Sequence, residues 1–127
     1  MNPHDPQAGW YAKFCNAFRG LELGIRGESS FQVHFVFGAA VIVAGAVLRI
    51  ADPGQWCLLL LCIAIVLSAE LFNSALERMA RAVSDEHDEN VGAALDIGSA
   101  AVLVASLGAA VVGTIIFLAR LGELLAW

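Results

Sequence analysis

Three long stretches of the chain contain no Asp, Glu, Lys or Arg: residues 31–48, 56–69 and 97–119. A helix needs about 20 predominantly apolar residues to cross the hydrocarbon core of a bilayer. Of the 127 residues, 59% are hydrophobic and only 15% are charged, which is not the composition of a soluble globule. The sequence therefore predicts an all-α membrane protein with three transmembrane helices.

Turn signals set the bounds of these elements within a single expected domain, residues 1–127. Residues 51–54 (Ala-Asp-Pro-Gly) separate the first two spans, and the polar linker 84–90 separates the second from the third. We expect spans at about 29–49, 55–83 and 93–119. Before them, at about 10–26, apolar residues recur every three or four positions opposite basic ones. This pattern predicts an amphipathic helix lying in the membrane interface.

The basic residues are distributed unequally between the two sides of the predicted membrane. One side carries Lys13, Arg19, Arg26, Arg78 and Arg81, whereas the other carries Arg49 and Arg120. Cytoplasmic loops carry an excess of Lys and Arg. The sequence therefore predicts a cytoplasmic N-terminus and a cytoplasmic linker between the second and third spans.

The end of the second span carries polar side chains on one helical face. Glu70, Asn73, Ser74 and Glu77 are spaced i, i+3, i+4 and i+7, so they project from the same side of a helix. A carboxylate inside the membrane costs at least a few kcal/mol when unpaired, so Glu70 is expected to be functional. Glu77 alone is equally compatible with the polar end of a membrane helix, where it would reach Arg78 or Arg81 at the headgroups.

The predicted topology brings four carboxylates from three segments to the cytoplasmic boundary: Glu28, Glu70, Glu77 and Asp96. Clustered carboxylates and an amide are typical of a divalent-cation site, because such ions prefer hard oxygen ligands and offset the repulsion between acidic groups. Small residues recur every fourth position in the third span, at Ala101, Ala105, Ala109 and Gly113, which favours close helix packing. We expect several chains to associate around the polar site.

Other function classes find no support in the sequence. The formal net charge is −5, and neither a basic cluster nor a Gly-rich phosphate loop is present, so nucleic-acid binding is not expected. The three cysteines fit neither a metal-binding spacing nor a disulfide framework.

Two segments resemble the signature of the small bacterial membrane lipid kinases, the diacylglycerol kinase and undecaprenol kinase family. They are residues 70–77 (Glu-Leu-Phe-Asn-Ser-Ala-Leu-Glu) and 96–103 (Asp-Ile-Gly-Ser-Ala-Ala-Val-Leu). Residues 17–21, with Glu28, Phe31 and His34 after them, are more similar to the undecaprenol kinase branch. The resemblance implies a homotrimer in the bacterial inner membrane that uses magnesium and ATP to phosphorylate a lipid hydroxyl at the cytoplasmic face.

The resemblance also implies roles for individual residues. Glu70 becomes the general base, supported by Asn73, and Glu28 and Glu77 become the magnesium ligands. The implied nucleotide site consists of Arg19, Glu28, Glu77, Arg81 and Asp96. His34, one turn or more into the first span, is of a kind that more often serves helix packing than chemistry.

The chain departs from the family pattern near the expected nucleotide. Leu95 and Ala93 stand where well-known members carry basic residues, and Arg81 stands where an aspartate is usual. Arg81 is therefore a candidate replacement for the missing cation. The alternative function is a kinase-like membrane scaffold, or a lipid- or metal-binding protein, that has lost ATP turnover. A small ion carrier is less favoured, because the acidic residues cluster on one side and do not trace a path across the bilayer.

Overall fold

The computed structural model describes residues 9–27, 29–83 and 88–126, and every regular element in these ranges is an α-helix. The helices are α1 (Trp10–Gly27), α2 (Ser29–Val47), α3 (Pro53–Val83) and α4 (Glu89–Leu125). By length and composition, α2, α3 and α4 are each long and apolar enough to cross a membrane. Three such helices behind an N-terminal helix confirm the predicted all-α membrane architecture.

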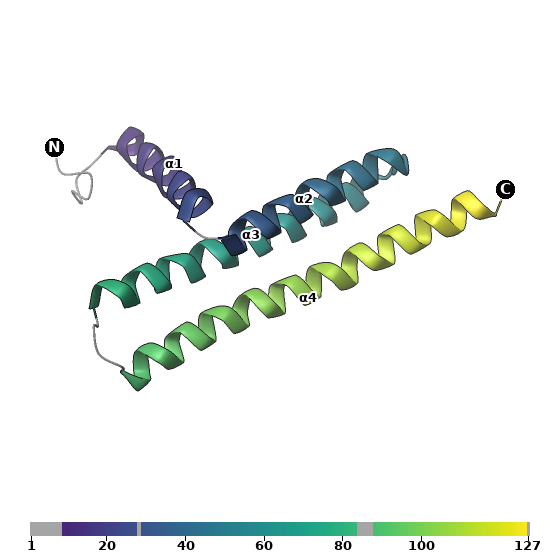
Figure 1. Ribbon diagram of the computed structural model, residues 1–127. Helices are drawn as coiled ribbons and strands as arrows, with labels where there is room; N and C mark the ends of the chain where they lie inside the picture. The colour runs from purple at the N-terminus through teal and green to yellow at the C-terminus, as the bar shows by residue number, and fades with distance from the viewer. Residues whose placement is uncertain (1–8, 28, 84–87, 127) are drawn as a thin grey trace.

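Helix α3 is the central element of the fold. Both α2 and α4 run alongside it in the opposite direction, and α1 leaves the bundle at an angle (Figure 1). The C-terminal end of α1 rests on α3, where Arg78 Nη2 donates to the carbonyl oxygen of Leu23 at 2.8 Å. A Cβ atom at Gly24 would overlap the side chain of Leu71, so this side chain packs directly against the backbone of α1. The end of α1 is thus fixed beside the polar half of α3.

The helix ends follow from capping chemistry. Helix α2 ends two residues before the predicted boundary, because Arg49 adopts a left-handed φ of 52° and the amide of Ile50 returns to the carbonyl oxygen of Gly45 at 3.0 Å. Asp52 Oδ1 accepts from the amide of Gly54 at 2.8 Å, and Pro53 occupies the first position of α3. Helix α4 begins at Glu89, four residues before the expected span, because Asp88 caps it.

The three long helices share a buried apolar cluster at the end away from Glu70. Ile50, Leu59 and Ile116 form a buried cluster there, and Trp56 Nε1 donates to the carbonyl oxygen of Ile50 at 2.9 Å. Arg120 Nε donates to the carbonyl oxygen of Leu48 at 2.9 Å, which joins α4 to the end of α2. In lipid, where burying apolar surface brings little gain, such packing and interhelical hydrogen bonds hold helices together.

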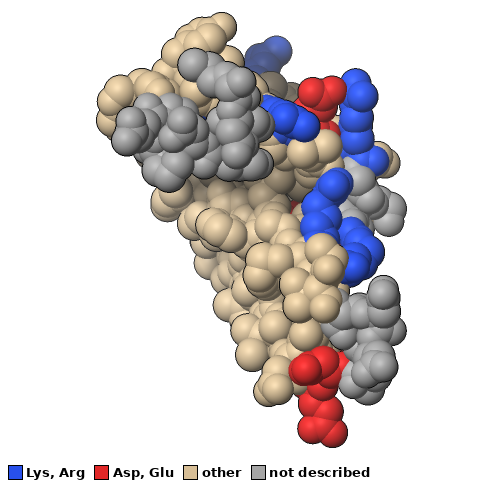
Figure 2. All heavy atoms as spheres, turned by 90° about the vertical axis from the view of Figure 1, so that its left-hand side faces the viewer, with Lys and Arg blue, Asp and Glu red and all other residues tan. Residues whose placement is uncertain are grey.

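Large apolar side chains elsewhere on the long helices point outward. Examples on α2 and α4 are Val36, Val43, Val104, Val111 and Leu118. Seen from the side of α1, Lys and Arg side chains gather along one flank of the molecule, and much of the remaining face carries uncharged residues (Figure 2). An apolar surface of this kind suits contact with hydrocarbon, as expected for membrane helices.

Candidate active site

Glu70 is buried between α2 and α3, with only 2% of its surface exposed. Its Oε1 atom accepts a hydrogen bond from Ser30 Oγ at 2.7 Å and lies 3.0 Å from His34 Nε2. Both partners come from the first turns of α2, where positions four apart share one face. The carboxylate that the sequence places inside the membrane is therefore surrounded by polar partners rather than by hydrocarbon alone.

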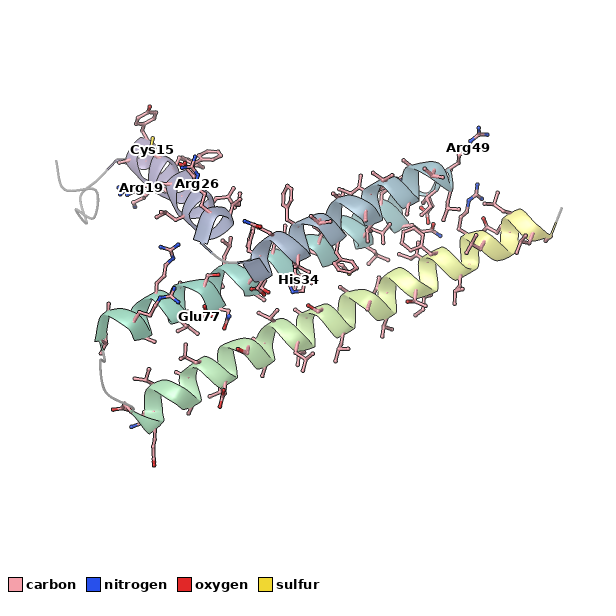
Figure 3. All side chains as sticks on the ribbon, viewed as in Figure 1. Cys15, Arg19, Arg26, His34, Arg49 and Glu77 are labelled. Carbon is pink, nitrogen blue, oxygen red and sulfur yellow. The ribbon has the colours of Figure 1, made fainter. Side chains whose placement is uncertain are left out.

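Asn73 and Glu77 form a second polar pair farther along α3. Asn73 Nδ2 donates to Glu77 Oε1 at 2.9 Å, and Arg81 Nη1 lies 3.9 Å from Glu77 Oε2. Seven residues separate Glu70 from Glu77, which corresponds to about 10 Å along a helix axis. The side chain of Glu77 points into the space between α3 and α4 (Figure 3). Glu70 and Glu77 therefore belong to two adjacent but separate polar positions.

The predicted site residues are only partly brought together within one chain. Asn73, Glu77 and Arg81 interact directly along α3. Asp96 on α4 and Arg19 on α1 are exposed, and within the described residues no hydrogen bond or ion pair joins either of them to Glu77. Glu28 lies outside the described residues. Arg78, which the sequence offers as a partner for Glu77, instead contacts Leu23 on α1.

Helix α4 approaches this polar face at Gly98. A Cβ atom there would lie 2.6 Å from Asn73 Oδ1 and 3.0 Å from Leu76 Cδ1. Asn73 Oδ1 is itself buried and accepts no hydrogen bond from the described part of the chain. The absence of a side chain at Gly98 is thus what allows Asn73 to lie between α3 and α4 while it holds Glu77.

We expect Gly98→Ala to displace Asn73 and to destabilise the packing of α3 against α4 by about 1–3 kcal/mol, the usual cost of overpacking. Gly108→Ala on the same helix is the matched control, because nothing lies within 4 Å of the added Cβ atom. The control should be slightly stabilising, by about 0.5–1 kcal/mol. Thermal unfolding of both variants in detergent checks the difference, and equal melting temperatures would contradict it.

An apolar groove of about 420 Å³ is lined in part by His34, the neighbour of Glu70. Residues of α2, α3 and α4 line it, from His34 at one end past Val66 and Ala109 to Phe117. Nearly all of the lining is hydrocarbon, and His34 belongs both to the groove wall and to the surroundings of Glu70. A hydrocarbon chain in this groove would contact His34, the neighbour of the buried carboxylate.

A search of known families matches residues 15–117 to the prokaryotic diacylglycerol kinases. The chain belongs to this family. The match covers the end of α1, all of α2 and α3, and most of α4, so it includes every residue of the polar site described above. The expected resemblance is therefore confirmed, and the family is one of membrane lipid kinases.

Individual members of the family are similar to this chain over most of its length. An undecaprenol kinase of Bacillus subtilis is 30% identical over 112 residues, which cover 88% of this chain and 90% of that protein. A diacylglycerol kinase of Escherichia coli K12 is 29% identical over 106 residues, covering 84% and 86%. A diacylglycerol kinase of Synechocystis is 30% identical over 113 residues, covering 88% and 64%. Both named acceptor classes thus occur among the relatives.

Membership of a kinase family implies ATP as the phosphoryl donor, and magnesium commonly accompanies ATP. Within the described residues, no three His, Cys, Asp or Glu side chains form a group able to hold a metal. Magnesium, however, is usually bound by one or two carboxylates together with phosphate oxygens. Glu77 has 31% of its side chain exposed and offers one such carboxylate. Glu77 therefore fits a magnesium ion that arrives bound to the nucleotide.

The contacts of Ser30 and His34 with Glu70 are not predicted by the sequence. The sequence favours a packing role for His34, and the structure adds that its imidazole lies against the buried Glu70. A weak signal was available, because the two polar residues are four apart at the start of an otherwise apolar span. Their rotation toward Glu70 depends on how α2 docks on α3, which spacing within one helix does not define.

Proposed function

We propose that this member of the family transfers the γ-phosphoryl group of ATP to the hydroxyl of a membrane lipid, either undecaprenol or a diacylglycerol, in a magnesium-dependent reaction. The observation that carries the proposal is the position of Glu70. It is 2% exposed, and its Oε1 atom lies 3.0 Å from Nε2 of His34, a residue that lines an apolar groove. A lipid whose hydrocarbon occupies the groove would present its hydroxyl to a carboxylate that bulk water does not reach.

In this proposal Glu70 is the general base. The lipid oxygen forms a bond to the γ-phosphorus while the bond from that phosphorus to the bridging oxygen breaks, and ADP departs. The hydroxyl proton passes to Glu70, which is positioned within the membrane half of the site. Phosphoryl transfer depends mainly on positioning and charge stabilisation, so a single base and a well-placed nucleotide suffice.

Glu77 and Glu28 are the proposed magnesium ligands, with Asn73 holding Glu77 in place through the hydrogen bond at 2.9 Å. When bound, magnesium would neutralise charge on the phosphates. Arg81 lies near Glu77, and Arg19 and Asp96 complete the proposed nucleotide site. Because Leu95 and Ala93 on α4 offer no charge, Arg81 is the cation that we expect to contact the phosphates.

The proposed assembly is a homotrimer in the bacterial inner membrane, with the N-terminus in the cytoplasm. No hydrogen bond or ion pair joins Arg19 or Asp96 to Glu77 within the described part of one chain, so in this proposal a neighbouring chain supplies the residues that close the nucleotide site. The excess of basic residues near α1 and the end of α3 supports the orientation.

The deciding experiment measures transfer of label from γ-labelled ATP to lipid. Purified protein is placed in vesicles that contain either undecaprenol or diacylglycerol, with and without magnesium. We expect label in the organic phase with at least one acceptor, and none after chelation of magnesium. Labelled product also identifies the acceptor. If ATP binds but no lipid is labelled in either case, the scaffold alternative suggested by Leu95 and Ala93 is favoured instead.

A further inference from the structure

Glu70 receives both of its described contacts on the same oxygen. Ser30 Oγ donates to Oε1 at 2.7 Å, and His34 Nε2 lies 3.0 Å from Oε1. In the described part of the chain, Oε2 accepts no hydrogen bond from either residue. A carboxylate oxygen has two lone pairs, so Oε1 is fully used while Oε2 keeps its capacity to accept a proton.

The contact with His34 requires a particular protonation pattern. A carboxylate that acts as a base is ionised and has no proton to donate, so in the proposed mechanism the proton between Oε1 and Nε2 belongs to the imidazole, and Nε2 is the donor. Two donors from one helix face prevent the carboxylate from rotating about its final bond. A rigidly held base is what proton abstraction at a defined position needs.

His34 also meets the space in which an acceptor would lie. It lines the apolar groove, and 24% of its side chain is exposed, compared with 2% for Glu70. The imidazole therefore forms the boundary between the groove and the carboxylate. From these contacts we infer that His34 is a positioning residue, which orients Glu70 so that Oε2 faces the acceptor hydroxyl. The inference rests on the proposed function and adds a residue to it.

A packing role and a positioning role of His34 predict opposite orders of activity for two substitutions at this position. Leucine fills space at position 34 and suits an apolar groove, but it has no donor. Glutamine carries an N–H group at about the distance of Nε2 and is less suited to hydrocarbon. If His34 only packs, the His34→Leu variant should be at least as active as the His34→Gln variant. If His34 orients Glu70, the glutamine variant should be the more active one.

The test measures kcat and KM for ATP in vesicles containing diacylglycerol, and again with undecaprenol. We expect His34→Leu to lower kcat by about 10- to 100-fold, the range typical of outer-shell partners, with little change in KM for ATP. His34→Gln should recover most of the loss. Val36→Leu is the matched control, because Val36 lies on the same helix, is exposed, and does not line the groove.

A double variant tests whether His34 affects kcat through Glu70. In a Glu70→Gln background, adding His34→Leu should lower kcat little further, because the residue through which it acts is already lost. Equal activity of the His34→Leu and His34→Gln variants, in a parent that Glu70→Gln impairs, would overturn the positioning role while leaving the proposed function intact. A parent without lipid phosphorylation would overturn both.

Discussion

Glu70→Gln should lower the turnover of lipid phosphorylation by about 100-fold or more while nucleotide binding persists. Glutamine has nearly the same size as glutamate, and its carbonyl oxygen still accepts from Ser30 Oγ and His34 Nε2. It does not accept a proton from a hydroxyl group. The loss should therefore fall on kcat, with KM for ATP nearly unchanged.

The matched control for this variant is Glu123→Gln. It makes the same change in charge near the C-terminal end of α4. Glu123 is exposed and pairs with Arg120 at 2.7 Å, and such surface pairs contribute only about 0–1 kcal/mol. The control should keep parental turnover. If Glu70→Gln also keeps it, Glu70 is not the base. A rise in melting temperature alone would then indicate a buried charge that is structurally costly and unused.

Glu77→Gln should impair the same reaction in a different way, because the proposed magnesium site loses a charged ligand. Even outer-shell partners of a bound metal typically contribute 10- to 100-fold to affinity or activity. We therefore expect the magnesium concentration for half-maximal rate to rise by at least about 10-fold, with partial recovery of turnover at high magnesium. Glutamine keeps an oxygen for Asn73 Nδ2, so the local packing should survive.

The two glutamate variants serve as controls for each other. Added magnesium should not restore Glu70→Gln, since proton acceptance does not depend on occupancy of the ion site. Titration of magnesium at fixed free ATP, for the parent and both variants, separates the two roles. An unchanged magnesium dependence in Glu77→Gln would show that this carboxylate is no ligand and favour its interpretation as a charged helix end.

The helices were predictable because membrane spans depend on length and on the absence of charge, both visible in the sequence. The shared face of Glu70, Asn73 and Glu77 was also predictable, since it depends only on spacing within α3. The close approach of α4 to α3 at Gly98 was harder to predict from the sequence. The expected small-residue stripe includes Gly113, where nothing lies within 4 Å of an added Cβ atom, whereas the close approach occurs at Gly98.

What the sequence left undetermined depends on contacts between segments. The partnership of His34 and Ser30 with Glu70 requires the rotation of α2 relative to α3, which no periodicity within α2 specifies. Arg78 contacts α1, whereas Arg81 pairs with Glu77. Which arginine makes which contact likewise depends on how α1 crosses α3. Arg19 and Asp96 remain predictions, since their roles depend on a nucleotide and on neighbouring chains.

The burial of Glu70 has a consequence for competing reactions. Any enzyme that activates a hydroxyl to attack ATP also risks activating water, which is far more abundant than any membrane lipid. A proposed base that is 2% exposed, and whose neighbour His34 lines a hydrocarbon groove, has few water molecules to deprotonate. If Glu70 is the base, the lipid bilayer would thus protect the nucleotide from wasteful hydrolysis: selectivity against the smallest possible acceptor would come from where the carboxylate is placed in the membrane rather than from contacts that recognise the lipid.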